Sequence, residues 1–313
     1  SPHAHALIKR IDASKAMKAP GVVGFFTGAD LEQNKIAGLP CGWLITDVNG
    51  QPMKEPAHPC LAVGKARYVG GHVAVVVAET YQQAKDAAEL VEVDYEVLPA
   101  VVEAVDALKP GAPALHEIAP DNKCYTWAIG DKGAVDKAFA QAAKVSTLEF
   151  VNNRLIPNAI EPRAATAAYN RSSDEYTLYV ASQNPHVERL LMTAFVMGLP
   201  EHKVRVVAPD VGGGFGSKIY LYAEDVVVTF AAKQLNRSGR RSARRASSPT
   251  RTAATTSPRP SSRWTRTATS SRCACTPSRT WGRTSPRSPR ASRRFSTPRC
   301  SPVSTRPRRS TAR

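Results

Sequence analysis

The sequence lacks any Cys-x-x-Cys pair among its six cysteines. That absence excludes the zinc-ribbon and thioredoxin-like classes, whose sites need such spacing. Cys41, Cys60 and Cys124 are far apart in the first part of the chain. Isolated cysteines favour buried thiols in a reducing compartment over a disulfide framework.

Long apolar runs are also missing, since no stretch approaches the roughly 18 apolar residues of a transmembrane helix. No charged-then-apolar leader is present either, so the sequence predicts a cytoplasmic protein without a membrane span or signal peptide. The chain begins with a strand-like segment, S-P-H-A-H-A-L-I-K, that has no Met. We therefore expect an N-terminal piece to be missing.

Acidic residues and eight other residue types are absent from residues 238–313. This tail has no Lys, Asp, Glu, Leu, Ile, Met, Tyr, Asn, Gln or His, yet it contains 20 Arg. The whole chain has a formal charge of +17, whereas residues 1–237, with 23 basic and 26 acidic side chains, carry a net charge of −3. The first part is therefore composed like an ordinary soluble protein, and 313 residues suffice for two domains. The tail cannot form a core and is predicted to be disordered.

Three hypotheses account for the tail. It is a basic arm that binds nucleic acid, a solvated linker, or a GC-rich gene translated in a shifted frame. A frameshift near residue 237 explains why Arg is the only charged residue there. Shifting the frame over residues 249–289 permits alternating strands, a D-A-D-G hairpin turn and the segment A-N-M-G-A-Y-L-S-T-F-A. We favour the frameshift and keep the basic arm as the alternative.

Residues 1–122 are predicted to form a mixed α/β domain. H-V-A-V-V-V-A at 72–78 is the β-branched run expected of a strand buried on both faces. Thr80 is suited to cap a helix that runs to about Leu90. V-E-V-D-Y at 91–95 then alternates as a second strand. This order predicts a βαβ unit.

Residues 123–237 are predicted to begin a second domain, in which a glycine-rich loop separates the last strand from the last helix. The expected elements are strands at 147–151, 176–182 and 203–208 and helices at 186–200 and 219–235.

The glycine-rich loop spans residues 207–218, V-A-P-D-V-G-G-G-F-G-S-K. Ser217 stands where G-x-G-x-x-G needs its third glycine, and Lys218 comes one position too late for a P-loop. What remains is a run of small residues whose backbone amides are suited to receive an anion. A tight turn is the simpler alternative. Three consecutive glycines exceed the needs of one turn, so we favour the close approach of a ligand.

The segment S-Q-N-P-H at 182–186 lies where a strand ends and a helix begins, which is where ligands bind in α/β folds. Gln183 is suited to offer its amide to a cofactor. Ser182 or Asn184 is expected to cap the helix. His186 is expected to be a surface residue, or one that lies behind the ligand-contacting residues, in preference to a metal ligand.

Other candidate residues are weaker. Within N-A-I-E-P-R at 158–163, Glu161 and Arg163 are expected to form a structural ion pair. His3, His5 and His72 lack the spacing of a metal site, so no metal ligand is assigned. No Ser-His-Asp or Cys-His arrangement is recognisable.

Together these segments resemble one family, the molybdopterin-binding large subunits of molybdenum hydroxylases, which include xanthine dehydrogenase, aldehyde oxidase and aerobic carbon monoxide dehydrogenase. The matching stretches are S-P-H-A-H-A-L-I-K-R-I-D, P-G-V-V-G-F-F-T-G-A-D-L, R-Y-V-G-G-H-V-A-V-V-V-A-E-T, A-A-E-L-V-E-V-D-Y-E-V-L-P-A-V-V, I-E-P-R, S-Q-N-P-H and V-G-G-G-F-G-S-K. They cover residues 1 to about 237, and the shifted-frame segment also resembles the family's continuation. The resemblance implies an α/β (α+β) fold, with a hammerhead domain at 1–122 and the start of a molybdopterin-binding domain at 123–237.

The resemblance also implies a chemistry. Enzymes of this family hydroxylate aldehydes, N-heterocycles or CO with oxygen from water, and a hydride passes to a sulfido ligand of molybdenum. Gln183 is implied to lie near the apical oxygen of molybdenum. Gly213, Gly214, Phe215 and Gly216 are implied to contact the cofactor, with Phe215 near the substrate channel.

The implied cofactor is molybdenum-molybdopterin, in its cytosine dinucleotide form. Partner subunits are implied too: an iron–sulfur small subunit with 2Fe-2S clusters and a medium subunit with FAD, in a dimer of heterotrimers.

Two departures from the family affect this chain. The family's general-base glutamate, near the far C-terminus, has no counterpart here, so no catalytic residue is assigned. The substrate loop is also missing, and none of Cys273, Cys275 and Cys300 takes the role of its cysteine. We therefore expect this chain to be catalytically inactive and unable to retain the cofactor. A nucleic-acid-binding protein and a small-molecule-binding module without catalysis stay open as other function classes.

Overall fold

The computed structural model describes residues 1–150 and 156–235. The elements of the first part are β1 (Ala6–Asp12), a 3₁₀ helix (Ala16–Lys18), β2 (Val22–Thr27), α1 (Gly28–Gln33), β3 (Lys65–Ala66), β4 (Ala74–Ala78), α2 (Tyr81–Glu89), β5 (Glu92–Val97), α3 (Ala104–Ala107) and α4 (Lys132–Ala140). They form two small antiparallel sheets, one with the strand order β3-β1-β5 and one that pairs β2 with β4.

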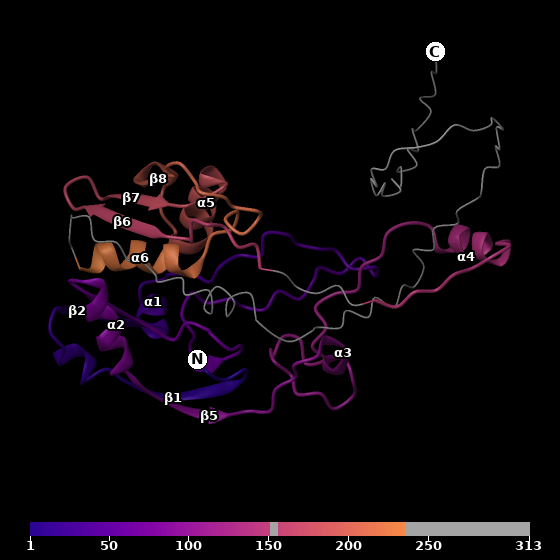
Figure 1. Ribbon diagram of the computed structural model, residues 1–313, viewed down its shortest axis with the longest axis horizontal. Coiled ribbons are helices and arrows are strands. Elements are labelled where there is room, and N and C mark those ends of the chain that lie inside the picture. Colours follow the sequence, from indigo (N-terminus) through magenta and orange to yellow (C-terminus); the bar gives the residue numbers. More distant parts are fainter. Residues whose placement is uncertain (151–155, 236–313) are drawn as a thin grey trace, which may run out of the picture. The chain divides into compact units, whose positions relative to one another are not determined.

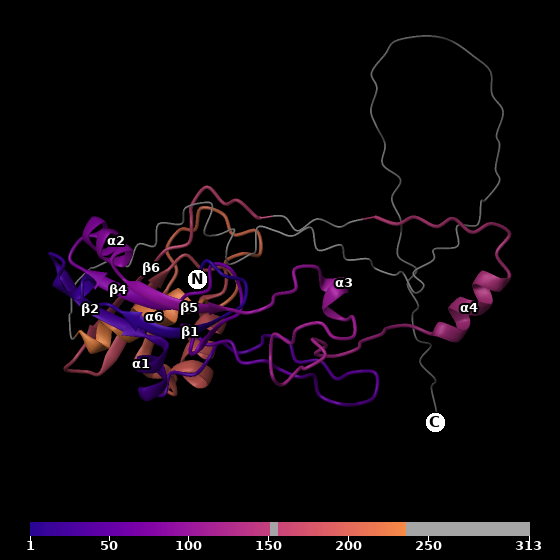
Figure 2. The ribbon, with the colours of Figure 1, turned by 90° about the horizontal axis from the view of Figure 1, so that it is seen from below.

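Helix α2 begins as predicted. Thr80 caps it, because its hydroxyl accepts a hydrogen bond from the Gln83 N–H at 3.2 Å while the Gln83 side chain returns to the Thr80 N–H. The helix lies along β4 (Figure 2), and β5 follows it, also as predicted. The predicted βαβ unit is wrong, however, because β4 and β5 belong to different sheets. The residues of β4 are only half-buried, since among the described strands it pairs with β2 alone.

The second part contains a three-stranded sheet. Its elements are β6 (Ala165–Asn170), β7 (Glu175–Val180), α5 (Pro185–Leu190), a π-helical turn (Leu191–Met197), a 3₁₀ helix (Glu201–Lys203), β8 (Val204–Val207) and α6 (Ala223–Gln234). Strand β7 pairs antiparallel with β6 and parallel with β8, and α6 covers one face of this sheet (Figure 1). Each described helix is too short or too polar to cross a membrane.

Two further predictions for this part have opposite outcomes. The helix that begins at Pro185 continues through the π-helical turn and ends at Gly198, whose φ of +60° suits glycine, as predicted. The predicted strand at 147–151 is wrong over 147–150, and residue 151 lies outside the described residues. Leu148 and Phe150 are exposed there. A segment with an alternating apolar pattern forms a β-strand only when a neighbouring strand is available to pair with it.

The apolar core joins the two parts. Side chains of β6, β7 and α6 cluster with Leu31, Cys60 and Leu61 from the first part, and the rings of Phe26 and Phe230 meet edge to face at 5.4 Å. Burial, with smaller contributions from two nearby carboxylates, raises the pKa of the Cys60 thiol to about 12. The expectation of buried thiols therefore holds for Cys60 but is wrong for the exposed Cys41.

Candidate functional site

The structure brings the two predicted site segments, S-Q-N-P-H and the glycine loop, into direct contact. The backbone N–H of Gln183 donates to the Lys218 carbonyl at 2.7 Å. The side-chain Oε1 of Gln183 accepts hydrogen bonds from the N–H groups of Gly216 at 3.0 Å and Lys218 at 3.1 Å. These two donors fix the orientation of the amide. Its Nε2 donor has no partner among the described residues.

The backbone of the loop turns sharply. Gly213, Phe215 and Gly216 have φ angles of +94°, +52° and +83°. The N–H groups of Gly214 and Phe215 donate to no acceptor within the described part of the chain. Consecutive N–H groups in such a turn form a concavity that attracts anionic or oxygen-rich ligands.

Two of the loop glycines are required by the protein's own side chains. A Cβ at Gly214 would lie 2.3 Å from the Gln183 Cδ, and one at Gly212 would lie 2.6 Å from the Glu161 Cβ. At Gly216 a Cβ would meet nothing within 4 Å. The close approach inferred from the sequence is therefore made by Gln183 and Glu161 at two positions, and open space remains at Gly216.

Phe215 combines exposure with backbone strain. Its side chain is 74% exposed, although it is a large apolar ring. A bulky residue with positive φ is uncommon, and such a conformation costs about 1–3 kcal/mol. Strain of this kind tends to occur at ligand sites, and here it lies beside the open N–H groups of the loop.

The predicted ion pair between Glu161 and Arg163 is wrong. Glu161 Oε2 instead accepts hydrogen bonds from Lys218 Nζ at 2.8 Å and from the Gly212 N–H at 2.6 Å, and these donors lower the pKa of Glu161. The Arg163 guanidinium lies 3.5 Å from the ring centre of Tyr222 and forms an ion pair with a different carboxylate. Lys218 is 57 residues away from Glu161, so no local pattern indicates their contact.

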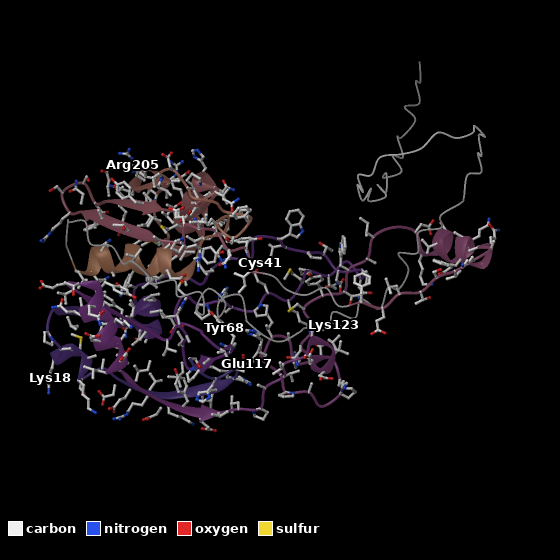
Figure 3. All side chains as sticks on the ribbon, in the orientation of Figure 1. Lys18, Cys41, Tyr68, Glu117, Lys123 and Arg205 are labelled. Atoms are coloured by element: carbon white, nitrogen blue, oxygen red, sulfur yellow. The ribbon has the colours of Figure 1, made fainter. Side chains whose placement is uncertain are left out.

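The rest of S-Q-N-P-H is structural. Ser182 Oγ accepts the Asn184 N–H at 3.1 Å, whereas the Asn184 side chain makes no capping bond to α5. His186 is exposed, as predicted. It lines a shallow cavity of about 330 Å³ together with Arg189 and Arg205, and Arg205 projects from the outer side of β8 (Figure 3). Val207 and Ala208, at the start of the glycine loop, also line that cavity, whereas Gly212, Gly213, Gly214 and Gly216 do not.

Sequence reasoning missed two buried carboxyl groups behind the site. Glu188 on α5 is 1% exposed and Asp225 on α6 is 6% exposed. One carboxyl oxygen of Glu188 has no hydrogen-bond partner within the described residues, and Asp225 Oδ2 accepts the Tyr222 N–H at 3.0 Å. Burial raises the pKa of Glu188 to about 7. Burial, followed by repulsion from Glu188, raises the pKa of Asp225. For Asp225 the available signal is the apolar run V-V-V that follows it, whereas Glu188, between Val187 and Arg189, gives no such signal.

Comparison with known proteins identifies both parts of the chain. A family model for the aldehyde oxidase and xanthine dehydrogenase a/b hammerhead domain matches residues 1–99. A model for the molybdopterin cofactor-binding domain matches residues 115–259. The fold is therefore that of a hammerhead domain followed by a molybdopterin-binding domain. The domain boundaries predicted at 122 and 237 stay predictions.

Relatives of known activity match the same region. The carbon monoxide dehydrogenase large chain of Afipia carboxidovorans is 39% identical over 244 residues, which are 74% of this chain and 29% of the relative. The nicotine 6-hydroxylase large subunit of Paenarthrobacter nicotinovorans is 33% identical over 75% of this chain and 28% of its own length. The crystal structure of quinoline 2-oxidoreductase from Pseudomonas putida 86 matches with a TM-score of 0.64 and 34% identity, covering 76% of this chain and 29% of the other.

The chain belongs to the molybdenum hydroxylases, the molybdopterin-dependent oxidoreductases of the xanthine dehydrogenase, aldehyde oxidase and carbon monoxide dehydrogenase type, and represents part of their large subunit. It spans about 29% of the length of the relatives above. The relatives give no support to the alternative of a nucleic-acid-binding protein, which depends on residues 238–313. Those residues lie outside the described part of the chain.

The open groups of the loop fit a molybdenum-pterin cofactor. They are three N–H donors: Nε2 of Gln183 and the backbone N–H groups of Gly214 and Phe215. Such a cofactor presents phosphate and metal-bound oxygens, which are acceptors, so donor and acceptor chemistry match. The carboxylate of Glu161, which packs against Gly212, binds Lys218 Nζ and the Gly212 N–H instead of these donors.

Proposed function

We propose that this chain provides one wall of the molybdenum-pterin site in an enzyme that hydroxylates a small-molecule substrate with oxygen from water. Gln183 donates through Nε2 to an oxygen of the cofactor, Gly214 and Phe215 donate through their backbone N–H groups, and the Phe215 ring faces the substrate side. When bound, the cofactor supplies the two-electron oxidation. The observation that carries this proposal is the orientation of the Gln183 amide. Its oxygen accepts two loop N–H groups, which leaves only a donor free.

The finer assignments belong to the same proposal. The substrate is an aldehyde, an N-heterocycle or CO, and the relatives named for nicotine and carbon monoxide support the last two. The cofactor is the cytosine dinucleotide form of molybdenum-molybdopterin. The relatives are named as large chains or subunits, which supports small and medium partners that carry 2Fe-2S clusters and FAD, in a cytoplasmic dimer of heterotrimers.

Because we expect this chain not to retain the cofactor on its own, contact is tested with the cofactor in large excess. Molybdenum cofactor released from a related enzyme is titrated without oxygen into the ¹⁵N-labelled full chain and followed by NMR. Binding is expected to shift the Gly214 and Phe215 amides and the Gln183 side-chain NH₂ selectively. Gln183→Ala is expected to weaken binding about tenfold, the value of one charge-assisted hydrogen bond. His186→Ala is the matched control from the same segment and is expected to leave binding unchanged. Shifts confined to other residues, or equal affinity of the Gln183 variant, would contradict the proposal.

A further inference from the structure

Lys218 is the only fully buried lysine among the described residues, with 2% of its surface exposed. Its ammonium group contacts Glu161 Oε2 at 2.8 Å. An ammonium group that loses its partner inside a protein is strongly destabilising, and the side chain then tends to move toward water. The position of Lys218 in the interior therefore depends on the carboxylate of Glu161.

The backbone of Lys218 is bound to the cofactor-facing residue. Its N–H donates to Gln183 Oε1 at 3.1 Å, and its carbonyl accepts the Gln183 N–H at 2.7 Å. A movement that exposes the Lys218 side chain shifts this backbone and breaks both bonds. The Gln183 amide then loses part of what orients it.

Glu161 also holds the other end of the loop. Its Oε2 accepts the Gly212 N–H at 2.6 Å, and its own N–H donates to the Gly212 carbonyl at 3.3 Å. One carboxylate thus connects the first glycine of the loop to the lysine at its end. The two open N–H groups, those of Gly214 and Phe215, lie between these fixed ends.

We propose that Glu161 is a positioning residue of the cofactor-binding loop. It acts through Lys218: by neutralising the buried ammonium it keeps the Lys218 backbone on Gln183 and the loop donors in place. Lys218 is accordingly a structural cation, in contrast to the lysine of a P-loop, which binds phosphate. The relevance to ligand binding rests on the proposed function, whereas the effect on the loop does not require a cofactor.

The test is hydrogen–deuterium exchange on the full chain without ligand, followed by mass spectrometry. The variants are Glu161→Gln, Lys218→Met and the double variant. Glu161→Gln keeps an acceptor for the Gly212 N–H but leaves the ammonium without a carboxylate. Lys218→Met keeps a long side chain in the buried space without its charge. The control is Asp136→Asn, which disrupts the exposed pair of Asp136 with Lys132 on α4.

Glu161→Gln is expected to speed exchange of the hydrogen-bonded amides of the loop, such as those of Gly212, Gly216 and Lys218, about tenfold. The effect is smaller than for a fully buried pair because the Glu161 side chain is 35% exposed. Exchange in β6 and β7 is expected to stay as in the original chain. Adding Lys218→Met to Glu161→Gln is expected to restore loop protection to within about threefold, because no buried charge then needs a partner. Asp136→Asn is expected to leave the 212–218 amides unchanged, since exposed pairs contribute little.

Unchanged loop exchange in Glu161→Gln overturns the proposal, and so does a double variant as unprotected as Glu161→Gln. Should Glu161→Gln fail to fold, the double variant decides. A folded double variant with a protected loop supports the proposal, and an unfolded one overturns it. If the original chain binds no cofactor but loop exchange still increases in Glu161→Gln, the proposed function is refuted and the role of Glu161 in the loop stands.

Discussion

Replacing Glu188 with glutamine is expected to change how the stability of this chain depends on pH. The residue is 1% exposed, and burial raises its pKa from 4.5 to about 7. The folded chain therefore keeps a proton that the unfolded chain releases as the pH rises through this window. The contribution of Glu188 to the free energy of unfolding is therefore present in full below pH 4.5 and is lost as the pH rises to about 7. A shift of this size corresponds to about 3 kcal/mol in the free energy of unfolding.

Glutamine has the shape of the protonated acid and no charge at any pH, so it removes the contribution of Glu188. Urea unfolding followed by circular dichroism is expected to give similar stabilities for both proteins near pH 4.5. Near pH 8 the variant is expected to be more stable, by about 3 kcal/mol. The free energy of unfolding of the variant still decreases with rising pH to some extent, because burial also raises the pKa of Asp225. Glu89→Gln, on the exposed surface of α2, is the control. Parallel stability curves for Glu188→Gln and the original chain would refute the reasoning.

Gly214→Ala is expected to destabilise the chain by about 2 kcal/mol in urea unfolding, because its Cβ displaces the Gln183 side chain and breaks the two hydrogen bonds that Oε1 accepts. Gly133→Ala, in the first turn of α4 where a Cβ makes only an ordinary contact with Asp131, is instead expected to stabilise by about 0.5 kcal/mol. Equal effects of the two substitutions would contradict this reasoning. Phe215→Gly is expected to raise stability by about 1 kcal/mol, since it relieves a positive φ and loses little burial; a marked loss would show that the ring is packed. Iodoacetamide is expected to label Cys41 in the folded chain and Cys60 only after urea is added, as followed by mass spectrometry. Equal labelling rates would contradict the burial of Cys60.

The elements that were predicted correctly obey local rules. The Thr80 cap of α2 and the end of a helix at Gly198 each depend on a few neighbouring residues. The βαβ unit and the strand at 147–150 were wrong for the opposite reason. A strand is defined by its partner, and neither apolar alternation nor the order of elements shows which strand that is.

The sequence by itself determined the family, through the order of its short segments, and it singled out Gln183 and the glycine loop as candidates. Only the tertiary structure decided how these groups are held. Glu161 meets Lys218 across 57 residues, and Glu188 influences Asp225 from another helix. Ionisable side chains interact in this way when folding removes them from water and brings another ionisable group close to them. The other group has the opposite charge in the first case and is a second carboxyl group in the second. Which partner that is depends on packing across the core, which no local spacing of residues records.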